Sequence, residues 1–207
     1  MTAPSTYRGS ITREQWLANE TRTVARLMVR ECIADTAELV QRVTESNLFG
    51  YPTEREQRSI ARACARRLNV LSDAPSTRVQ LINLIAEGTP DQLRQTNLYA
   101  MARDNRIVWD FLAGLVAHKT KTLDFALTRR EIEMFLQGLR QQSDRAATWS
   151  DSTMNKIRQV LTQCLEQSGI YNRKTQQISQ PILDFELEQC MRANDDTELL
   201  AAFGITQ

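Results

Sequence analysis

Arginines line one side of a helix predicted between residues 53 and 71. At about 100° per residue, one arc of about 80° holds Arg55, Arg58, Arg62 and Arg66. The opposite side holds Ile60, Cys64, Leu68 and Leu71. Arg67 flanks the row, and the span 53–70 carries five arginines against two glutamates, a net charge of +3.

A row of guanidinium groups suits the phosphate backbone of a nucleic acid. Each phosphate that a basic side chain neutralises releases condensed counterions, whatever the base sequence. The sequence is also rich in arginine relative to lysine, and the planar arginine fork matches phosphate geometry. Arginines on an ordinary solvent-exposed helix surface, paired with carboxylates elsewhere in the fold, would show the same spacing.

A second polar face lies on a helix predicted over residues 151–168. Its buried stripe is predicted to contain Met154, Ile157, Val160, Leu161, Cys164 and Leu165. The outward face then carries Ser152, Asn155, Lys156, Gln159, Thr162 and Gln163. Hydroxyl, amide and ammonium groups can hydrogen-bond base edges in a major groove. A polar outer face is also the ordinary property of any surface helix, so both interpretations stay open.

The neighbours of this helix favour a helix-turn-helix-like part. A helix predicted over 128–142 precedes it, although the connection from 142 to 150 is longer than the tight turn of the standard motif. The segment 169–180 resists a helical interpretation and could form a short β-hairpin. Arg173 and Lys174 would then lie at its tip, where a wing contacts phosphates. The span 140–174 holds six basic and three acidic residues.

Catalytic and metal-binding chemistry find little support in the residue types. His118 is the only histidine, which excludes histidine-based triads and sites with several histidines. The four cysteines form no CxxC pair, and neither of the usual glycine-rich phosphate-binding motifs occurs. We therefore expect no enzyme activity, no metal, no cofactor and no small-molecule substrate.

Helical periodicity extends over almost the whole chain, and glycine and proline are sparse. Capping pairs are Thr12 with Gln15, Asp35 with Glu38, Thr53 with Glu56, Thr128 with Glu131 and Asp195 with Glu198, and Thr89-Pro90 marks another start. The predicted helices are 13–31, 36–46, 53–71, 76–87, 90–102, 105–119, 128–142, 151–168, 181–192 and 196–203.

These segments predict an all-α protein of about ten helices. We expect an N-terminal helical subdomain over 1–120 and a C-terminal helix-turn-helix-like subdomain over 121–207. No apolar run approaches the roughly 20 residues that cross a bilayer. The N-terminus lacks a secretory pattern, so we expect a cytoplasmic protein with no membrane association.

The C-terminal residues differ in charge from the rest. Residues 181–207 hold six acidic residues and one arginine, a net charge of −5. Such a segment is unsuited to DNA and better suited to a protein partner.

Several landmarks together resemble the BrxA family, small helical accessory proteins of bacterial BREX phage-defence systems. The most specific landmark is Trp149-Ser-Asp-Ser-Thr-Met-Asn-Lys-Ile. The others begin at Thr23 (Thr-Val-Ala-Arg-Leu-Met-Val), Asn47 (Asn-Leu-Phe), Arg66 (Arg-Arg-Leu), Val108 (Val-Trp-Asp-Phe-Leu), Thr128 (Thr-Arg-Arg-Glu-Ile-Glu-Met-Phe-Leu) and Leu165 (Leu-Glu-Gln-Ser-Gly-Ile).

The resemblance implies an all-helical fold similar to the antitermination factor NusB. It also implies DNA binding within a multi-gene system that distinguishes host from phage DNA by methylation, and it carries no catalytic residues. With it, we expect DNA contact at both polar faces, with other BREX proteins as partners. A protein adaptor is the first alternative, and RNA binding by analogy with NusB is the second.

Overall fold

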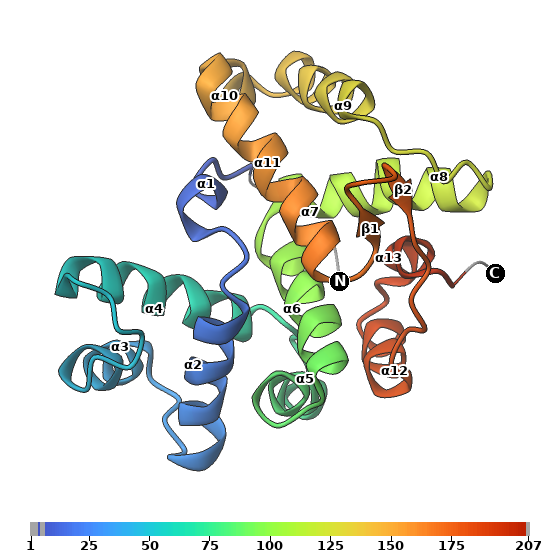
Figure 1. Ribbon diagram of the computed structural model, residues 1–207. Helices are drawn as coiled ribbons and strands as arrows, with labels where there is room; N and C mark the ends of the chain where they lie inside the picture. The colour runs from blue at the N-terminus through green and yellow to red at the C-terminus, as the bar shows by residue number, and fades with distance from the viewer. Residues whose placement is uncertain (1–3, 5–6, 206–207) are drawn as a thin grey trace.

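Helices make up most of the structure, a computed structural model that describes residue 4 and residues 7–205 (Figure 1). In the N-terminal part they are α1 (Ile11–Glu14), α2 (Ala18–Arg30), α3 (Thr36–Glu45), α4 (Glu54–Asn69), α5 (Pro75–Ala86) and α6 (Pro90–Asp104). A continuous helical stretch follows as α7 (Arg106–Asp110), the π-helix η1 (Phe111–Val116) and α8 (Ala117–Lys121).

The rest of the chain adds a small sheet to the helices. It contains α9 (Arg129–Gln142), α10 (Asp144–Ala147), α11 (Asp151–Gln167), β1 (Tyr171–Asn172), β2 (Gln177–Ile178), α12 (Phe185–Ala193), α13 (Thr197–Leu200) and the 3-10 helix η2 (Ala201–Phe203). The all-α prediction, with one short hairpin, is confirmed.

The centre of the molecule is α6, which α2, α4, α5, α11 and α12 all contact. From Gln95 to Asp104 every residue of α6 is buried, including the polar ones. Most of the polar side chains are paired: Gln95 donates to the Ile182 carbonyl at 2.9 Å, and Asn97 donates to the Trp16 carbonyl at 2.9 Å. Thr96 Oγ1 and Asn97 Oδ1 are the exceptions on this helix, since neither has a hydrogen-bond partner among the described residues. A helix surrounded on all sides needs such partners, because a buried polar group without one is costly.

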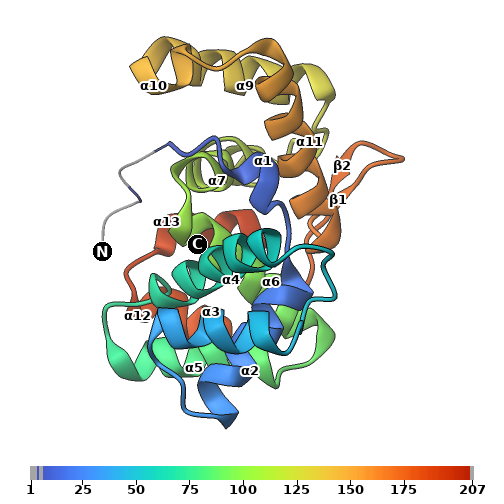
Figure 2. The ribbon, with the colours of Figure 1, turned by 90° about the vertical axis from the view of Figure 1, so that its left-hand side faces the viewer.

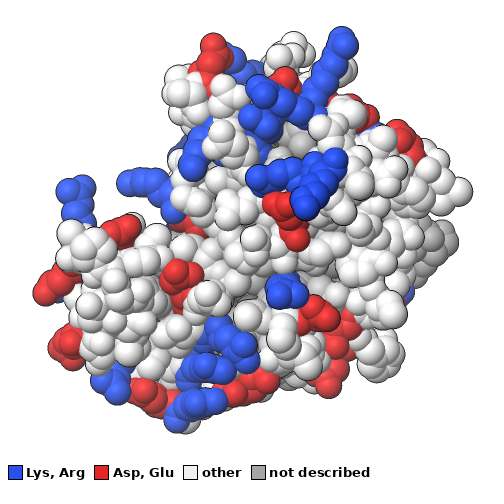
Figure 3. Space-filling model, in the orientation of Figure 1, with Lys and Arg blue, Asp and Glu red and all other residues white. Residues whose placement is uncertain are grey.

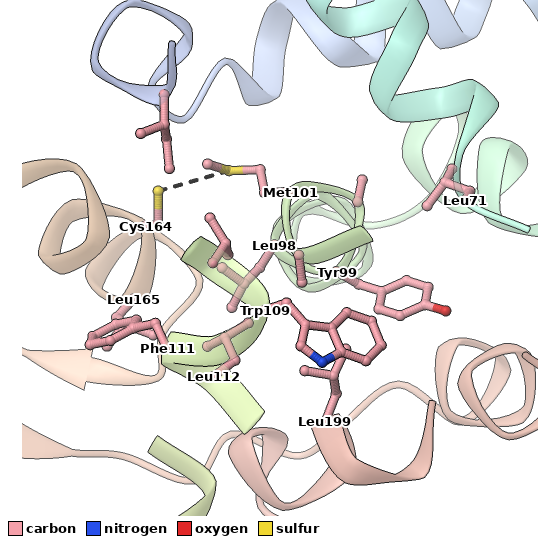
Figure 4. Close-up of a cluster of buried hydrophobic side chains, with 14 of the residues drawn as sticks. Leu71, Leu98, Tyr99, Met101, Trp109, Phe111, Leu112, Cys164, Leu165 and Leu199 are labelled. Atoms are coloured by element: carbon pink, nitrogen blue, oxygen red, sulfur yellow. Dashed lines mark hydrogen bonds between the residues drawn. The ribbon is translucent and has the colours of Figure 1, made fainter. Parts of the chain in front are cut away.

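One end of the molecule is built from α9, α10 and α11. In Figure 2, α9 and α10 lie above the other helices, and α11 descends from them toward α6. Figure 4 shows how α11 is fixed: Cys164 and Leu165 point into a cluster with Met101 of α6 and Phe111 of η1. The inner face of α11 is therefore part of the main core.

The C-terminal segment folds back on the N-terminal helices, where α12 contacts α5 and α6. A buried polar network joins the two parts. The Tyr99 hydroxyl donates to Asp196 Oδ2 at 2.6 Å, and Arg103 reaches the same oxygen at 2.9 Å. The expected boundary near residue 120 stays a prediction, with residues on both sides of it sharing this network.

Most predicted helix starts are confirmed at the level of side-chain caps. Asp35 and Thr53 accept from backbone N–H groups, and Thr89 and Thr128 form complete capping boxes with Gln92 and Glu131. The pair Asp195 with Glu198 is wrong, because Asp195 lies outside α13 at φ 60° and Asp196 is the N-cap.

The predicted helix 13–31 is wrong in its first turn. The chain breaks between α1 and α2, where Gln15 and Leu17 adopt φ values of 36° and 48°. Thr12 does not cap a helix; its hydroxyl donates to the Gly9 carbonyl. The carbonyls of Glu14, Gln15 and Trp16 instead accept hydrogen bonds from Arg67, which holds this irregular turn in place.

Among the described residues, no helix combines the length and the apolar character needed to cross a membrane.

Candidate nucleic-acid interface

The orientation of α11 follows from its apolar stripe. Met154, Ile157, Val160, Leu161, Cys164 and Leu165 are all buried, as the sequence predicted. Ser150 caps the helix by accepting from the Thr153 N–H at 3.2 Å. Because one face is fixed in the core, the opposite face must lie toward solvent.

That outward face carries most of the side chains that the sequence placed there. Ser152, Asn155, Lys156 and Gln159 are exposed, and Gln163 is half-buried. Thr162 is a correction, since only 9% of its surface is exposed and its hydroxyl donates to the Arg158 carbonyl at 2.9 Å. The face is therefore narrower than predicted and consists mainly of amide and ammonium groups.

The predicted hairpin directly follows α11. Tyr171 pairs with Ile178 and Asn172 with Gln177 in an antiparallel ladder. Asn172 Oδ1 accepts from the Lys174 N–H at 3.0 Å, which shapes the tip, and Gln176 completes the turn at φ 55°. Side chains of Arg173 and Lys174 are exposed at this tip.

A third extended segment, which the sequence analysis missed, ties the hairpin to α9. Ala126 pairs with Gln177, the Leu127 N–H donates to the Gln176 carbonyl at 2.8 Å, and the Ile178 N–H donates to the Phe125 carbonyl at 2.7 Å. The segment is too short to show an alternating pattern. Its pairing places the hairpin beside the start of α9, so α9, α11 and the hairpin form one surface.

The buried side chain of Lys119 holds this third segment in place through ion pairs. Its side chain is 5% exposed, and its Nζ lies 2.6 Å from both Asp124 Oδ2 and Glu131 Oε1. Burial opposes the charge of the ammonium, but hydrogen bonds to both carboxylates outweigh it and raise the pKa of Lys119. Lysine hydrogen bonds also lower the pKa of Asp124 and of Glu131, which burial alone would raise.

A groove of about 660 Å³ runs between α9, α11 and the hairpin. Its walls include Lys156 and Gln159 of the outward face and Arg173 of the tip. Two more basic residues that sequence reasoning missed, Arg129 and Arg158, also line it. Arg158 lies at the margin of the buried stripe, and only folding brings Arg129 of α9 beside α11.

Carboxylates already engage part of this positive charge. Arg173 lies 3.1 Å from Glu166, and Arg129 lies 2.6 Å from Glu133. Figure 3 shows basic side chains gathered over the upper part of this face, where α9–α11 and the hairpin lie, with several acidic ones between and beside them. Within the described residues, Lys156 and Lys174 make no ion pair.

The arginine row of α4 divides into an outer and an inner part. Arg55, Arg58 and Arg62 are exposed, and Arg58 pairs with Glu54 at 3.1 Å. A groove of about 720 Å³ between α3 and α4 is lined by Arg58 and Arg62. Asp35, Glu45 and Glu54 line the same groove, so its net charge is lower than the row suggests.

The inner part of the row, Arg66 and Arg67, stabilises the fold. The prediction that these two side chains contact DNA therefore requires a correction. Arg67 is 2% exposed and donates to backbone carbonyls, so a phosphate has no access to it. Arg66 lies 2.7 Å from Asp104 and 2.7 Å from Glu14. The hydrogen bonds that Arg66 donates to Asp104, together with its charge interactions with Asp104 and Glu14, raise the pKa of Arg66 despite its burial.

Three comparisons with known proteins bear on the family and the fold of this chain. The family model described as BrxA matches residues 5–195. "BREX protein BrxA" of Bacillus cereus (strain H3081.97) is 27% identical over 161 residues, which cover 77% of this chain and 78% of that protein. A crystal structure of an uncharacterized protein from Magnetospirillum magneticum shares the fold. It has a TM-score of 0.77 at 19% identity, covering 95% of this chain and 97% of that one.

Proposed function

This chain belongs to the BrxA family, and we propose from that premise that it is a DNA-binding, non-enzymatic component of a BREX defence system. The relative named "BREX protein BrxA" supports the assignment to such a system. We propose that the protein acts in the cytoplasm, where it binds double-stranded DNA and contacts other BREX proteins.

One observation carries the DNA assignment: the order and pairing of α9, α11 and the hairpin. A short extended segment, two longer helices joined through the short α10, and a β-hairpin paired with that segment follow one another, an order similar to that of a winged helix-turn-helix with a longer turn. In this arrangement the second helix enters the major groove, and the hairpin contacts the flanking backbone. We propose that Ser152, Asn155, Lys156 and Gln159 approach base edges and that Arg173 and Lys174 contact phosphates.

We propose the exposed arginines of α4 as a second phosphate contact. Arg55 and Arg62 have no ion-pair partner within the described residues, and the pair of Arg58 with Glu54 is exposed and weak. These three side chains can therefore turn to a phosphate at little cost. Arg66 and Arg67 are left out of this contact because the fold already uses them.

A second candidate function, a protein adaptor, is favoured by a different observation. Ile182 and Phe185 are 95% and 70% exposed at the start of α12, within the acidic C-terminal segment. Large apolar side chains at such exposure are typical of protein contacts. An adaptor of this kind would assemble the BREX proteins without binding DNA itself.

Binding of the purified protein to matched nucleic acids separates these functions. We expect duplex DNA to bind more tightly than single-stranded DNA or duplex RNA of the same sequence, in fluorescence anisotropy at low salt. RNA has a deep, narrow major groove that side chains cannot read. Tighter binding to RNA would favour the NusB-like function. Absence of all nucleic-acid binding would favour the adaptor.

A further inference from the structure

Four carboxamide side chains follow one another along a ridge of α11 that turns gradually around the helix. Asn155, Gln159, Gln163 and Gln167 are each four residues apart. Residues at this spacing are neighbours on the helix surface, each about 6 Å further along the axis and turned by about 40° from the last. Asn155, Gln159 and Gln167 are exposed, and Gln163 is half-buried.

The amide oxygens and NH₂ groups of this row have no hydrogen-bond partner in the described part of the protein. By contrast, the fold uses the buried helical glutamines Gln57 and Gln95. Gln57 donates to the Tyr51 carbonyl, and Gln95 donates to the Ile182 carbonyl and accepts from the Asp184 N–H. The row on α11 thus presents a series of free donors and acceptors along one edge.

The surroundings of the row suit a polyanionic ligand. Gln159, Gln163 and Gln167 line the groove between α9, α11 and the hairpin, where Lys156 and Arg173 supply positive charge. The carboxylate nearest to the row in sequence, Glu166, pairs with Arg173. A carboxamide beside a basic groove can therefore approach a base edge without strong repulsion from the protein.

The chemistry of a carboxamide selects among bases. Its oxygen and its NH₂ group match adenine in the major groove, where N7 accepts and the N6 amino group donates. Guanine presents two acceptors at the same edge and is better matched by arginine or lysine.

We propose that this row reads adenine in the major groove, so that the protein prefers A·T pairs in the DNA segment that α11 contacts. The inference rests on the proposed DNA-binding function and specifies the base class that it recognises. Asn155 and Gln159, the exposed members beside Lys156, make the principal contacts.

Three duplexes of equal length distinguish this inference from its alternatives. They contain alternating A·T, alternating G·C and alternating inosine·C pairs. Inosine·C resembles A·T in the minor groove but G·C in the major groove. We expect the A·T duplex to bind at least about fivefold more tightly than both others. Equal binding of the A·T and inosine·C duplexes would place any preference in the minor groove and overturn the inference.

A base analogue and a variant pair complete the experiment. Replacing adenine by 7-deazaadenine removes the N7 acceptor and should abolish the preference for A·T. Gln159→Ala should reduce the preference, whereas Gln189→Ala, at an exposed glutamine of α12, should leave it unchanged. Equal affinity for all three duplexes, with binding intact, would refute the inference and leave the DNA-binding function standing. Failure to bind any duplex would refute the function itself.

Discussion

The Cys164 Sγ atom of α11 lies 3.8 Å from the Met101 Sδ atom of α6 (Figure 4). Both side chains are buried, and burial raises the pKa of the Cys164 thiol to about 12. The contact therefore joins the apolar surfaces of two helices, and the Cys164 thiol is not activated as a nucleophile. It fixes the rotation of α11 about its axis, and so determines which side chains face the groove.

Replacing Met101 by alanine tests this packing. The side chain is 2% exposed, so Met101→Ala should lower the free energy of unfolding by about 2–5 kcal/mol through lost burial and a new cavity. Met134→Ala, at a methionine that is 60% exposed, is the matched control and should change it by less than about 0.5 kcal/mol. Urea denaturation measures both. Similar decreases in the free energy of unfolding for the two variants would argue against the packing of Met101 in the core.

Two arginines of α4 should behave in opposite ways. Arg67→Ala leaves the Glu14 and Gln15 carbonyls without their side-chain donor, while the Trp16 carbonyl keeps only Asn97, and should destabilise the protein by at least about 3 kcal/mol, measured by urea denaturation. Arg62→Ala should leave stability unchanged and reduce the dependence of log Kd on log salt by about one unit. An unchanged salt dependence would remove α4 from the DNA interface.

The Lys119 cluster predicts a pH dependence of stability. Asp124 and Glu131 have folded pKa values below their ordinary values of 3.8 and 4.5, so the folded state binds fewer protons at these carboxylates. Their stabilisation is present above those ordinary values and is lost as the pH falls through the lowered ones. Lys119→Met should therefore destabilise the protein at pH 7 and have a smaller effect near pH 3.

The matched control for this effect is Lys121→Met, at an exposed lysine of the same helix. Its urea midpoint should follow that of the unmodified protein at every pH. If Lys119→Met lowered the urea midpoint by the same amount at every pH down to 3, the ion pairs of Lys119 would not be what holds the extended segment before α9.

Thiol reactivity reports on the whole core. Cys32 is exposed, whereas Cys64, Cys164 and Cys190 are buried and burial raises the pKa of each of these three. A thiol-specific reagent at pH 8 should label only Cys32 in the native protein and all four cysteines in denaturant, because the thiolate is the reactive form. Rapid labelling of a second native thiol would contradict the packing.

The sequence predicted elements whose signals are local. Thr89 and Thr128 cap their helices as complete boxes because each capping pair lies within four consecutive residues. The exposed face of α11, except for the buried Thr162, also followed from spacing alone. The break before α2 could not be predicted, because Arg67, some fifty residues away, binds the carbonyls that make it possible.

The same limit applies to the candidate interface. Helical spacing alone cannot separate Arg62, which is exposed, from Arg66, which two carboxylates hold. Those carboxylates, Glu14 and Asp104, come from other elements of the fold. Arg129 reaches the groove only because the segment before α9 pairs with the hairpin, and that segment is too short to carry a strand pattern.

The central claim is that α11 and the hairpin form the DNA-binding surface. The most direct measurement is the salt dependence of duplex binding for Lys156→Ala/Lys174→Ala, compared with Arg30→Ala/Arg42→Ala, which removes two charges from α2 and α3. We expect the first variant to lose about two units of slope and the second to lose none. Equal losses in both variants, or an unchanged slope in the first, would contradict the claim.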